Sequence, residues 1–257
     1  MLHKLPHIAY ILDDFYLSIF PPVSFIFQPR VGITLLVSLN SEPFTLQSES
    51  GEIKYYSAAL LNRQDPITYK SDSCSCLEIN FLPLTTEYHS LTPFINSQSH
   101  IEITFDKDIS QEFWISDIVK ETADATQLSV GCKQILDSIK GYLPTEVKPD
   151  KRAIYVAENI REQLPKINLL EFHASTVGLS GNRLSHLFKD ELHMPIKSYI
   201  LVEKVKRGGY FINQGMSITE ASQEAGFADS AHFTRSFKEF FGITPRRMLD
   251  SVNVHFL

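Results

Sequence analysis

Two groups of polar and basic residues near the C-terminus repeat each other at an offset of 49 positions. The first group is Asn182, Arg183, Ser185, His186 and Lys189, and the second is Ser230, Ala231, His232, Thr234, Arg235 and Lys238. Arginine can bridge O6 and N7 of guanine, hydroxyls and amides can hydrogen-bond base edges, and lysines bind phosphates. Neither group contains an acidic residue. These residue types therefore predict contacts with the major groove of double-stranded DNA, with a merely solvated polar face as the alternative for each helix.

Other residues suited to chemistry are few. Cys74 and Cys76 are separated by one residue, so in a strand both thiols would point to the same face. We interpret them, like Cys132, as ordinary reduced cysteines, with a metal or redox pair as the alternative. The sequence contains no nucleotide-binding glycine loop, zincin motif or nucleophile elbow. We expect neither enzymatic activity nor a metal or other cofactor.

The apolar residues between the polar ones indicate how each group is presented. Leu184 and Phe188 lie four positions apart, as do Phe233 and Phe237. This is the spacing of one buried face of a helix, which leaves the polar residues on the opposite, exposed face.

A short helix and a tight turn are predicted before each of these helices. Gly178 and Gly226 stand where the turn needs a left-handed backbone, and Ser180 and Asp229 are suitable N-caps. A helix, a glycine-containing turn and a capped second helix form a helix-turn-helix arrangement, here predicted twice. The periodicity predicts helices over 151–163, 168–177, 181–191, 196–213, 218–225, 230–241 and 245–250, the last beginning at Pro245.

The segment from Ile218 to Lys238, ITEASQEAGFADSAHFTRSFK, resembles the signature of the AraC/XylS transcription regulators. It continues into FGITP, from Phe241 to Pro245, which matches the family's closing Gly-x-Thr-Pro. The first unit, from Leu179 to Tyr199, matches more loosely, and the resemblance covers about residues 152–250. It implies a seven-helix domain in which a long central helix joins two helix-turn-helix units that address successive major-groove segments.

The resemblance also assigns base-facing positions. They fall on Asn182, Arg183, Ser185 and His186 in the first unit, and on Ser230, Ala231, His232, Thr234 and Arg235 in the second. We expect Arg235 to contact a base directly, and Lys189 and Lys238 to contact phosphates or the adjoining core surface.

Four departures from the family pattern stand out. His173 replaces an apolar residue, and we interpret it as a core histidine, with a pH-sensing role as the alternative. Gly208-Gly209 interrupts the central helix, which predicts a looser setting of the two units. His193-Met194-Pro195-Ile196 replaces a Gly-x-x-Pro pattern, and Met248 replaces a tyrosine.

The first half of the chain reads as short strands followed by helices. Strands are expected over 33–39, 44–46, 53–56, 58–61, 67–69, 76–81 and 101–105, which favours an antiparallel sandwich or barrel. Helical apolar stripes follow over 113–119 and 128–143. The predicted fold is α+β, with an N-terminal antiparallel β domain with trailing helices (1–145), a proline-containing linker (146–151) and an all-α domain (152–257).

In length, strand content and trailing helices, the first domain resembles the cupin-like sensing domains of the family. Its histidines, His3, His7, His89 and His100, are scattered and lack the His-x-His pair of metal-binding cupins. The aromatic residues Phe25, Phe27, Tyr55, Tyr56 and Phe81 are interpreted as core, with the lining of an effector pocket as the alternative. Basic residues that could pair with an acidic effector are Arg30, Lys54, Arg63 and Lys70.

One helical stripe is a candidate for self-association. It consists of Leu128, Cys132, Ile135, Leu136 and Ile139. Such a stripe can form the core of its own domain or the interface of a homodimer.

Charge is divided unevenly over the 257 residues, whose net charge is −6. From Lys151 onward the chain has 14 Lys and Arg and 11 Asp and Glu, a net charge of +3, whereas the preceding residues have a net charge of −9. The acidic half need not contact DNA. No apolar run of about 18 residues and no signal peptide is recognisable, so a cytoplasmic location is expected.

These observations predict a sequence-specific DNA-binding regulator of transcription, an activator that contacts RNA polymerase. Its N-terminal domain would sense an effector, support dimerisation, or both. Two alternatives remain: a regulator controlled by protein partners without a small-molecule ligand, and a cupin-type enzyme with a helical appendage.

Overall fold

The computed structural model describes residues 7–27, 32–40, 42–48, 51–62, 66–95, 98–106, 109, 112–142, 149–164 and 169–257. The chain divides into two compact units, one formed by Met1–Glu146 together with Ser251–Leu257, and the other by Val147–Asp250. This differs from the expected division at the C-terminus, because the last seven residues belong to the first unit. Among the described helices, none combines the length and apolar character needed to cross a membrane.

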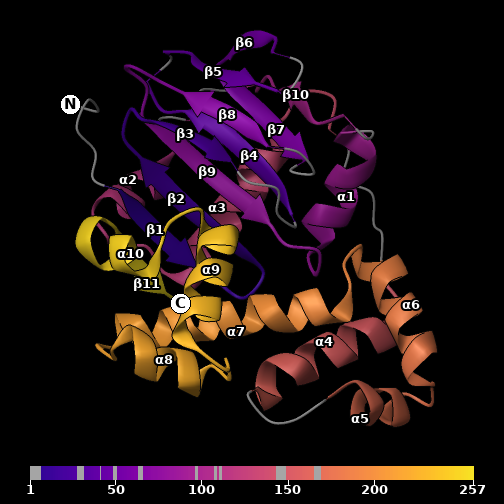
Figure 1. The fold of residues 1–257 in the computed structure, drawn as a ribbon. Helices are drawn as coiled ribbons and strands as arrows, with labels where there is room; N and C mark the ends of the chain where they lie inside the picture. Colours follow the sequence, from indigo (N-terminus) through magenta and orange to yellow (C-terminus); the bar gives the residue numbers. More distant parts are fainter. Residues whose placement is uncertain are drawn as a thin grey trace. The chain divides into compact units, whose positions relative to one another are not determined.

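Two β-sheets form the first unit (Figure 1). The larger has the strand order β10-β7-β4-β9-β2-β1-β11, and its strands are β1 (Ile8–Ile11), β2 (Phe15–Phe20), β4 (Ile33–Ser38), β7 (Ala58–Asn62), β9 (Cys76–Phe81), β10 (His100–Glu102) and β11 (Asn253–Phe256). The smaller has the order β3-β8-β5-β6, with β3 (Ser24–Phe27), β5 (Phe44–Gln47), β6 (Ile53–Tyr56) and β8 (Ile67–Lys70). Within the described strands, every pairing is antiparallel except that of β1 with β11.

The central strands of the larger sheet, β2, β4 and β9, are buried on both faces. In β4, Ile33, Leu35 and Val37 join the core beneath the helices, whereas Leu36 joins the core shared with the smaller sheet. Alternate residues of a strand point to opposite faces, so its almost continuous apolar run fills two cores at once. The smaller sheet covers one face and three helices cover the other.

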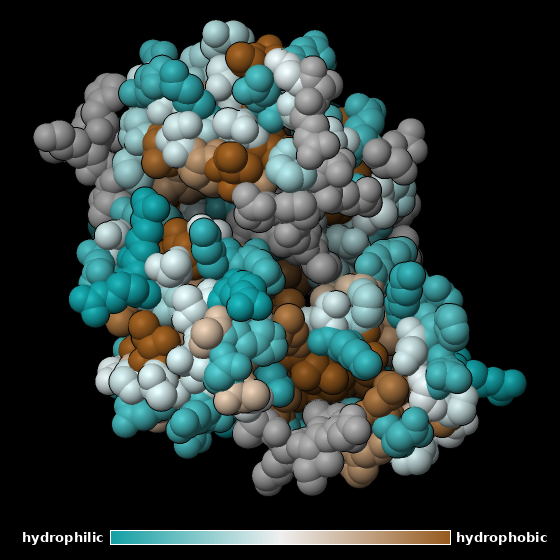
Figure 2. All heavy atoms as spheres, in the orientation of Figure 1, coloured by the Kyte–Doolittle hydropathy of each residue, from teal (hydrophilic) through white to brown (hydrophobic). Residues whose placement is uncertain are grey.

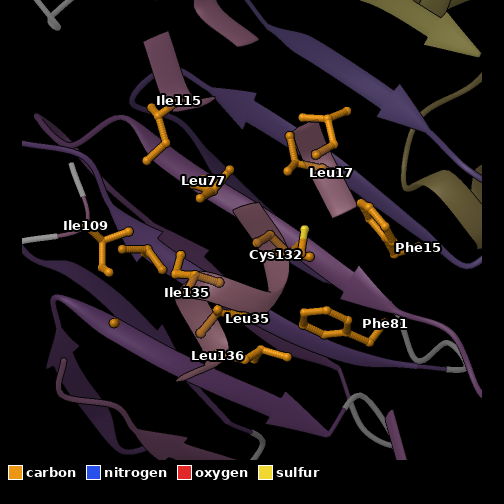
Figure 3. Packing of buried hydrophobic residues seen from close by; sticks show 14 of the residues in the cluster. Phe15, Leu17, Leu35, Leu77, Phe81, Ile109, Ile115, Cys132, Ile135 and Leu136 are labelled. Atoms are coloured by element: carbon orange, nitrogen blue, oxygen red, sulfur yellow. The ribbon is translucent and has the colours of Figure 1, made fainter. Parts of the chain in front are cut away.

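Those helices are α1 (Thr86–Ile95), α2 (Phe113–Val119) and α3 (Ala125–Asp137). Figure 3 shows side chains of α3 meeting those of β2, β4 and β9 in the core. A capping box formed by Asp124 and Gln127 begins α3. The helix ends at Asp137 and not at residue 143, because Ile139 forms an antiparallel bridge with Phe105.

The stripe proposed as a dimer interface lies inside this core. Leu128, Cys132, Ile135, Leu136 and Ile139 are at most 3% exposed and pack against the larger sheet of the same chain. The assignment of these five residues to a dimer interface is therefore corrected, because their side chains are covered within the unit.

The second unit is helical and follows the predicted pattern closely. Its helices are α4 (Lys151–Gln163), α5 (Leu169–Thr176), α6 (Gly181–Leu192), α7 (Ile196–Asn213), α8 (Ile218–Glu224), α9 (Ser230–Phe241) and α10 (Pro245–Ser251). The helices α5 and α6 pack together, as do α8 and α9, and the long helix α7 contacts α6, α8 and α9. Two helix-turn-helix units joined by a central helix are confirmed.

Candidate nucleic-acid interface

The helix α6 presents the first predicted group of residues. Ser180 is its N-cap and accepts a hydrogen bond from the Arg183 backbone N–H. The completely buried Leu184 and Phe188 fix the inner face of the helix. The outer face then carries exposed Asn182, Arg183, His186 and Lys189, with Ser185 half-buried.

The second group lies on α9 in the same manner. The Asp229 carboxylate accepts a hydrogen bond of 2.7 Å from the His232 backbone N–H and so caps the helix. Phe233 and Phe237 are fully buried. The outer face consists of exposed Ala231, His232, Arg235 and Lys238, with Ser230 and Thr234 half-buried.

Glycines form the turn before each of these helices. Gly178 has φ +69° and Gly226 has φ +82°, both in the left-handed region that the sequence predicted for them. The turns let α5 and α8 pack across the helices that follow them, which is the geometry of a helix-turn-helix unit. The structure therefore brings each predicted group together on one exposed helix face, while the two groups lie on separate helices.

Gly208 sets the distance between the central helix and α9. A Cβ atom at this position would collide with the ring of Phe233. The glycine thus allows the Phe233 ring to pack directly against the backbone of α7. The expectation of a looser setting at this glycine is corrected, because the missing side chain permits close packing.

The turn of the second unit is also held from α7 by a residue that the sequence analysis missed. The Lys204 ammonium group donates a hydrogen bond of 2.7 Å to the carbonyl oxygen of Gly226. Its position on α7 carried no local signal, because the turn lies 22 residues further along the chain. Lys204 therefore helps to position α9 through the turn that precedes it.

A buried ionic cluster joins α4 to α7. The Glu203 carboxylate, 5% exposed, lies 3.5 Å from the Lys206 ammonium group and 4.0 Å from Nε of Arg161. Removing one member of such a cluster leaves the others buried without compensation, so it helps specify how these two helices pack.

Further basic residues lie beside the second unit on α10. Arg246 and Arg247 are exposed, and Arg246 forms a surface ion pair of 3.1 Å with Asp250. Figure 2 shows mainly hydrophilic side chains over α6, α9 and α10. These arginines lie outside the two predicted groups of residues, although their type suits contacts with phosphates.

Two histidines of the first helix-turn-helix, one on α5 and one at the end of α6, depart from the family pattern for different reasons. His173 is 1% exposed and its Nε2 has no hydrogen-bond partner among the described residues, so burial lowers its pKa and favours the neutral ring. It is a core histidine, as interpreted, but its Nε2 lacks the partner expected of a satisfied one. His193 ends α6 with φ +53°, in the left-handed region that glycine would adopt without strain.

The aromatic residues considered for an effector pocket do not line one common space. Phe27 and Tyr56 belong to the core between the two sheets, Phe81 belongs to the core beneath the helices, and Phe25 packs at the edge of the first of these. Tyr55 is 70% exposed. Core is therefore the better interpretation for most of them.

Of the four basic residues considered as effector partners, two can be assessed. Lys54 lies 3.3 Å from Glu52, and Lys70 lies 3.4 Å from Asp72, both at the surface. Arg30 and Arg63 lie outside the described residues.

Polar residues inside the first unit form a different cluster. The Glu78 carboxylate, 6% exposed, accepts hydrogen bonds from Tyr16 Oη at 2.9 Å and Ser18 Oγ at 3.2 Å. Two residues further along β9, Asn80 Nδ2 donates a hydrogen bond of 2.8 Å to Thr34 Oγ1 of the neighbouring strand β4. These side chains lie on the face of the larger sheet that points away from α1, α2 and α3.

The cysteines are reduced and buried. Cys74 and Cys76 lie in the core between the sheets, and the Tyr69 hydroxyl is 3.7 Å from the Cys74 sulfur. Hydrogen bonding, first from Cys76, lowers the pKa of Cys74 to about 6 although burial opposes it, while burial raises the pKa of Cys76. Within the described part of the chain, no three His, Cys, Asp or Glu residues gather as a metal site would require.

Comparisons with known proteins agree with this geometry. A family profile described as a helix-turn-helix domain matches residues 173–251. The Msm operon regulatory protein of Streptococcus mutans is 37% identical over 75 residues, which are 29% of this chain and 27% of that protein. The F1 operon positive regulatory protein of Yersinia pestis is 32% identical over 94 residues, or 36% of this chain and 30% of that one. The match thus spans less than a third of either relative.

The fold of both units has a counterpart among solved structures. The structure of wild-type ToxT from Vibrio cholerae with a bound unsaturated fatty acid aligns with a TM-score of 0.57 at 11% identity, covering 93% of this chain and 96% of that chain. The combination of an N-terminal β domain with a C-terminal helical domain is therefore that of ToxT. The sequence matches add that residues 173–251 are similar to a helix-turn-helix domain found in operon regulatory proteins.

Proposed function

We propose that this chain is a sequence-specific DNA-binding regulator that activates transcription. The observation that carries the proposal is the pair of capped helices, α6 and α9, whose outer faces are polar to basic, with no acidic side chain before Asp190 on α6 and Glu239 on α9. A helix with such a face fits the major groove, where arginine and polar side chains distinguish base pairs. Each helix would enter one segment of the groove.

Local placement of charge, and not the total charge, supports binding. The helical half has a balance of only +3. A strong, sequence-independent attraction to phosphates needs more cations than this excess provides. Contacts by Arg183, Lys189, Arg235 and Lys238 would therefore supply both affinity and register.

The activating role is supported by the relatives. One is named an operon regulatory protein and the other an operon positive regulatory protein. By analogy, we propose that this chain acts on an operon promoter through contact with RNA polymerase. A cytoplasmic location follows from that role.

The first unit is proposed to receive the regulatory signal and to support a homodimer. Its fold is shared with ToxT, for which a structure with an unsaturated fatty acid exists. The buried polar cluster around Glu78 offers hydrogen-bonding groups inside this unit. Thermal-shift measurements against metabolites and fatty acids test for an effector, because a ligand that binds only the folded state raises its stability. Stability unchanged by every compound would favour control by protein partners.

The DNA-binding proposal is tested by selecting duplexes that bind the full chain and then measuring variants on the selected site. Arg235→Ala is expected to cost about 1–3 kcal/mol on that site and to relax the preference at one base pair. Lys238→Ala, which removes the same charge from the same helix, is expected to weaken binding evenly across sequences.

Both variants are compared with the parent chain at one salt concentration, since salt changes affinity steeply. Equal losses for Arg235→Ala on the selected site and on random DNA would contradict base recognition by Arg235. Failure of the parent chain to enrich any sequence would contradict the proposed function itself.

A further inference from the structure

The C-terminal strand β11 is the edge strand of a sheet whose other strands all precede the helical unit. The chain leaves the first unit at Glu146, forms the seven helices, and returns to the first unit at Ser251. There β11 pairs in parallel with β1, from Ile8 opposite Asn253 to Ile11 opposite Phe256 (Figure 1). The helical unit is thus attached to the sheet-containing unit through both of its ends.

Backbone hydrogen bonds extend beyond the paired residues. The Asn253 N–H donates to the His7 carbonyl at 2.9 Å, and the Leu257 N–H donates to the Ile11 carbonyl at 3.1 Å. The pairing therefore runs to the last residue of the sequence.

A single carboxylate fastens two side chains of this strand. Glu121 accepts a hydrogen bond of 2.8 Å from Asn253 Nδ2 through one oxygen, and its other oxygen lies 2.9 Å from Nε2 of His255. The His255 ring stacks on Tyr10 of β1, with 4.6 Å between ring centroids and 18° between planes. We call Glu121 and the strand Asn253–Phe256 the C-terminal latch.

The backbone of Glu121 is an independent indication that this contact has a role. Glu121 has φ +58°, a left-handed conformation that costs a residue with a Cβ atom more than it costs glycine. Glycine would suit the turn between α2 and α3 better. At this strained position the glutamate side chain contacts β11, whose first residue, Asn253, lies 132 positions later in the sequence.

Almost no chain separates β11 from the second helix-turn-helix unit. The helix α10 ends at Ser251 and β11 begins at Asn253, so Val252 alone lies between them. At the other end, Gly242 closes α9 and α10 begins at Pro245. A change in the position of β11 must therefore be taken up by α10 and by the end of α9.

We propose that the C-terminal latch couples the state of the larger sheet to the second helix-turn-helix unit. The inference rests on the proposed function, since it describes how the first unit and DNA act on each other. A four-residue edge strand, paired with β1 on one side only and fastened by one partly exposed carboxylate, can open locally without unfolding the sheet. If DNA binding and latch closure are linked, each changes the free energy of the other by the same amount.

The latch is opened in the full-length chain by Glu121→Gly. Glycine relieves the left-handed strain, so the first unit should keep its stability, while β11 loses the contacts of Asn253 and His255 with the Glu121 carboxylate. Thr122→Ala is the matched control, because it alters the same exposed turn without touching β11. Hydrogen exchange at the paired amides of Asn253 and Leu257 is expected to rise about tenfold or more in Glu121→Gly, with a smaller rise in α10.

The latch is closed permanently by Ala9→Cys/Val254→Cys. These residues face each other in the register of β1 and β11 and are half-buried, so an intramolecular disulfide can form on oxidation by oxidised glutathione. The three native cysteines are buried, and Ala9→Cys alone serves as the control. Affinity for the selected duplex is expected to change about fivefold or more between the opened and the cross-linked chain.

Three results would overturn the inference. Unchanged exchange of β11 in Glu121→Gly would show that Glu121 does not hold the strand. If hydrogen exchange of α10 is the same in the parent chain and in Glu121→Gly although β11 has opened, β11 and α10 are not coupled. This measurement needs no DNA. Equal DNA affinity of the opened and cross-linked chains would show that recognition is independent of the latch. If the parent chain selects no DNA, the proposed function fails, while exchange in α10 still decides the coupling.

Discussion

At the scale of single residues, burial of His173 makes the free energy of unfolding depend on pH. The ring is almost fully buried on α5, and burial lowers its pKa, so the folded chain keeps it neutral. The unfolded chain protonates the same ring near pH 6.5. The folded state then binds fewer protons than the unfolded state as the pH falls below that value. Stability associated with His173 is complete above pH 6.5 and declines as the pH falls towards the lower folded-state pKa.

We therefore expect His173→Leu to make the helical unit less sensitive to acid. Urea unfolding of the parent and the variant, followed at pH 7.5 and pH 5.5, measures the free energy of unfolding. The parent should lose more stability over this interval than the variant. His186→Gln, which changes an exposed histidine on α6, is the control and should behave like the parent. An identical loss in His173→Leu and the parent would assign the acid sensitivity to other groups.

At the scale of elements, the packing of α7 against α9 depends on an absent side chain. Alanine is normally favoured over glycine in a helix by about 1 kcal/mol. At Gly208 the added methyl group would collide with Phe233, and overpacking of a core costs about 1–3 kcal/mol. The collision outweighs the gain in helix propensity, so the glycine is the better residue here.

Gly208→Ala is accordingly expected to destabilise the helical unit, by up to about 2 kcal/mol as the net of these effects, and to weaken DNA binding by displacing α9. A double-mutant cycle with Phe233→Leu isolates the cause, because the smaller side chain leaves room for the methyl group. The double variant should be more stable than the sum of the single changes predicts. Additive losses would mean that the methyl group does not contact Phe233.

The helices of the second unit were predictable because their signals are local. Leu184 and Phe188 repeat at helical spacing, and Ser180 and Asp229 cap the helices that directly follow them. The strand β11 was missed because its partner β1 lies about 245 positions earlier, and four residues carry no local signal for such a pairing. Lys204 was missed for the same reason, and α1 lies in a stretch where Pro93 argues against a helix. Which residues reach DNA remains a prediction.

At the scale of the whole molecule, the net charge of −6 averages over two units with different expected partners. The unit that carries α6 and α9 is the mildly basic one, and the acidic excess belongs to the residues before Lys151. The sequence indicated which face of a helix is polar, but it did not indicate which surface the apolar face packs against. For α3, periodicity favoured core and left a dimer interface as the alternative, and the packing of the stripe against the larger sheet bears out core.

Leu136 allows that distinction to be tested on assembly. Its side chain is 2% exposed in the core between α3 and the larger sheet. Leu136→Glu places an unpaired carboxylate there, which costs several kcal/mol, so the first unit should unfold rather than yield a folded monomer. Val130→Glu alters the same helix on a side chain that is 48% exposed and should leave the fold intact. Circular dichroism and light scattering report folding and mass for both variants. A well-folded Leu136→Glu chain of half the parent's mass would return this stripe to the dimer interface, whereas a halved mass in Val130→Glu alone would place the interface on the outer face of α3.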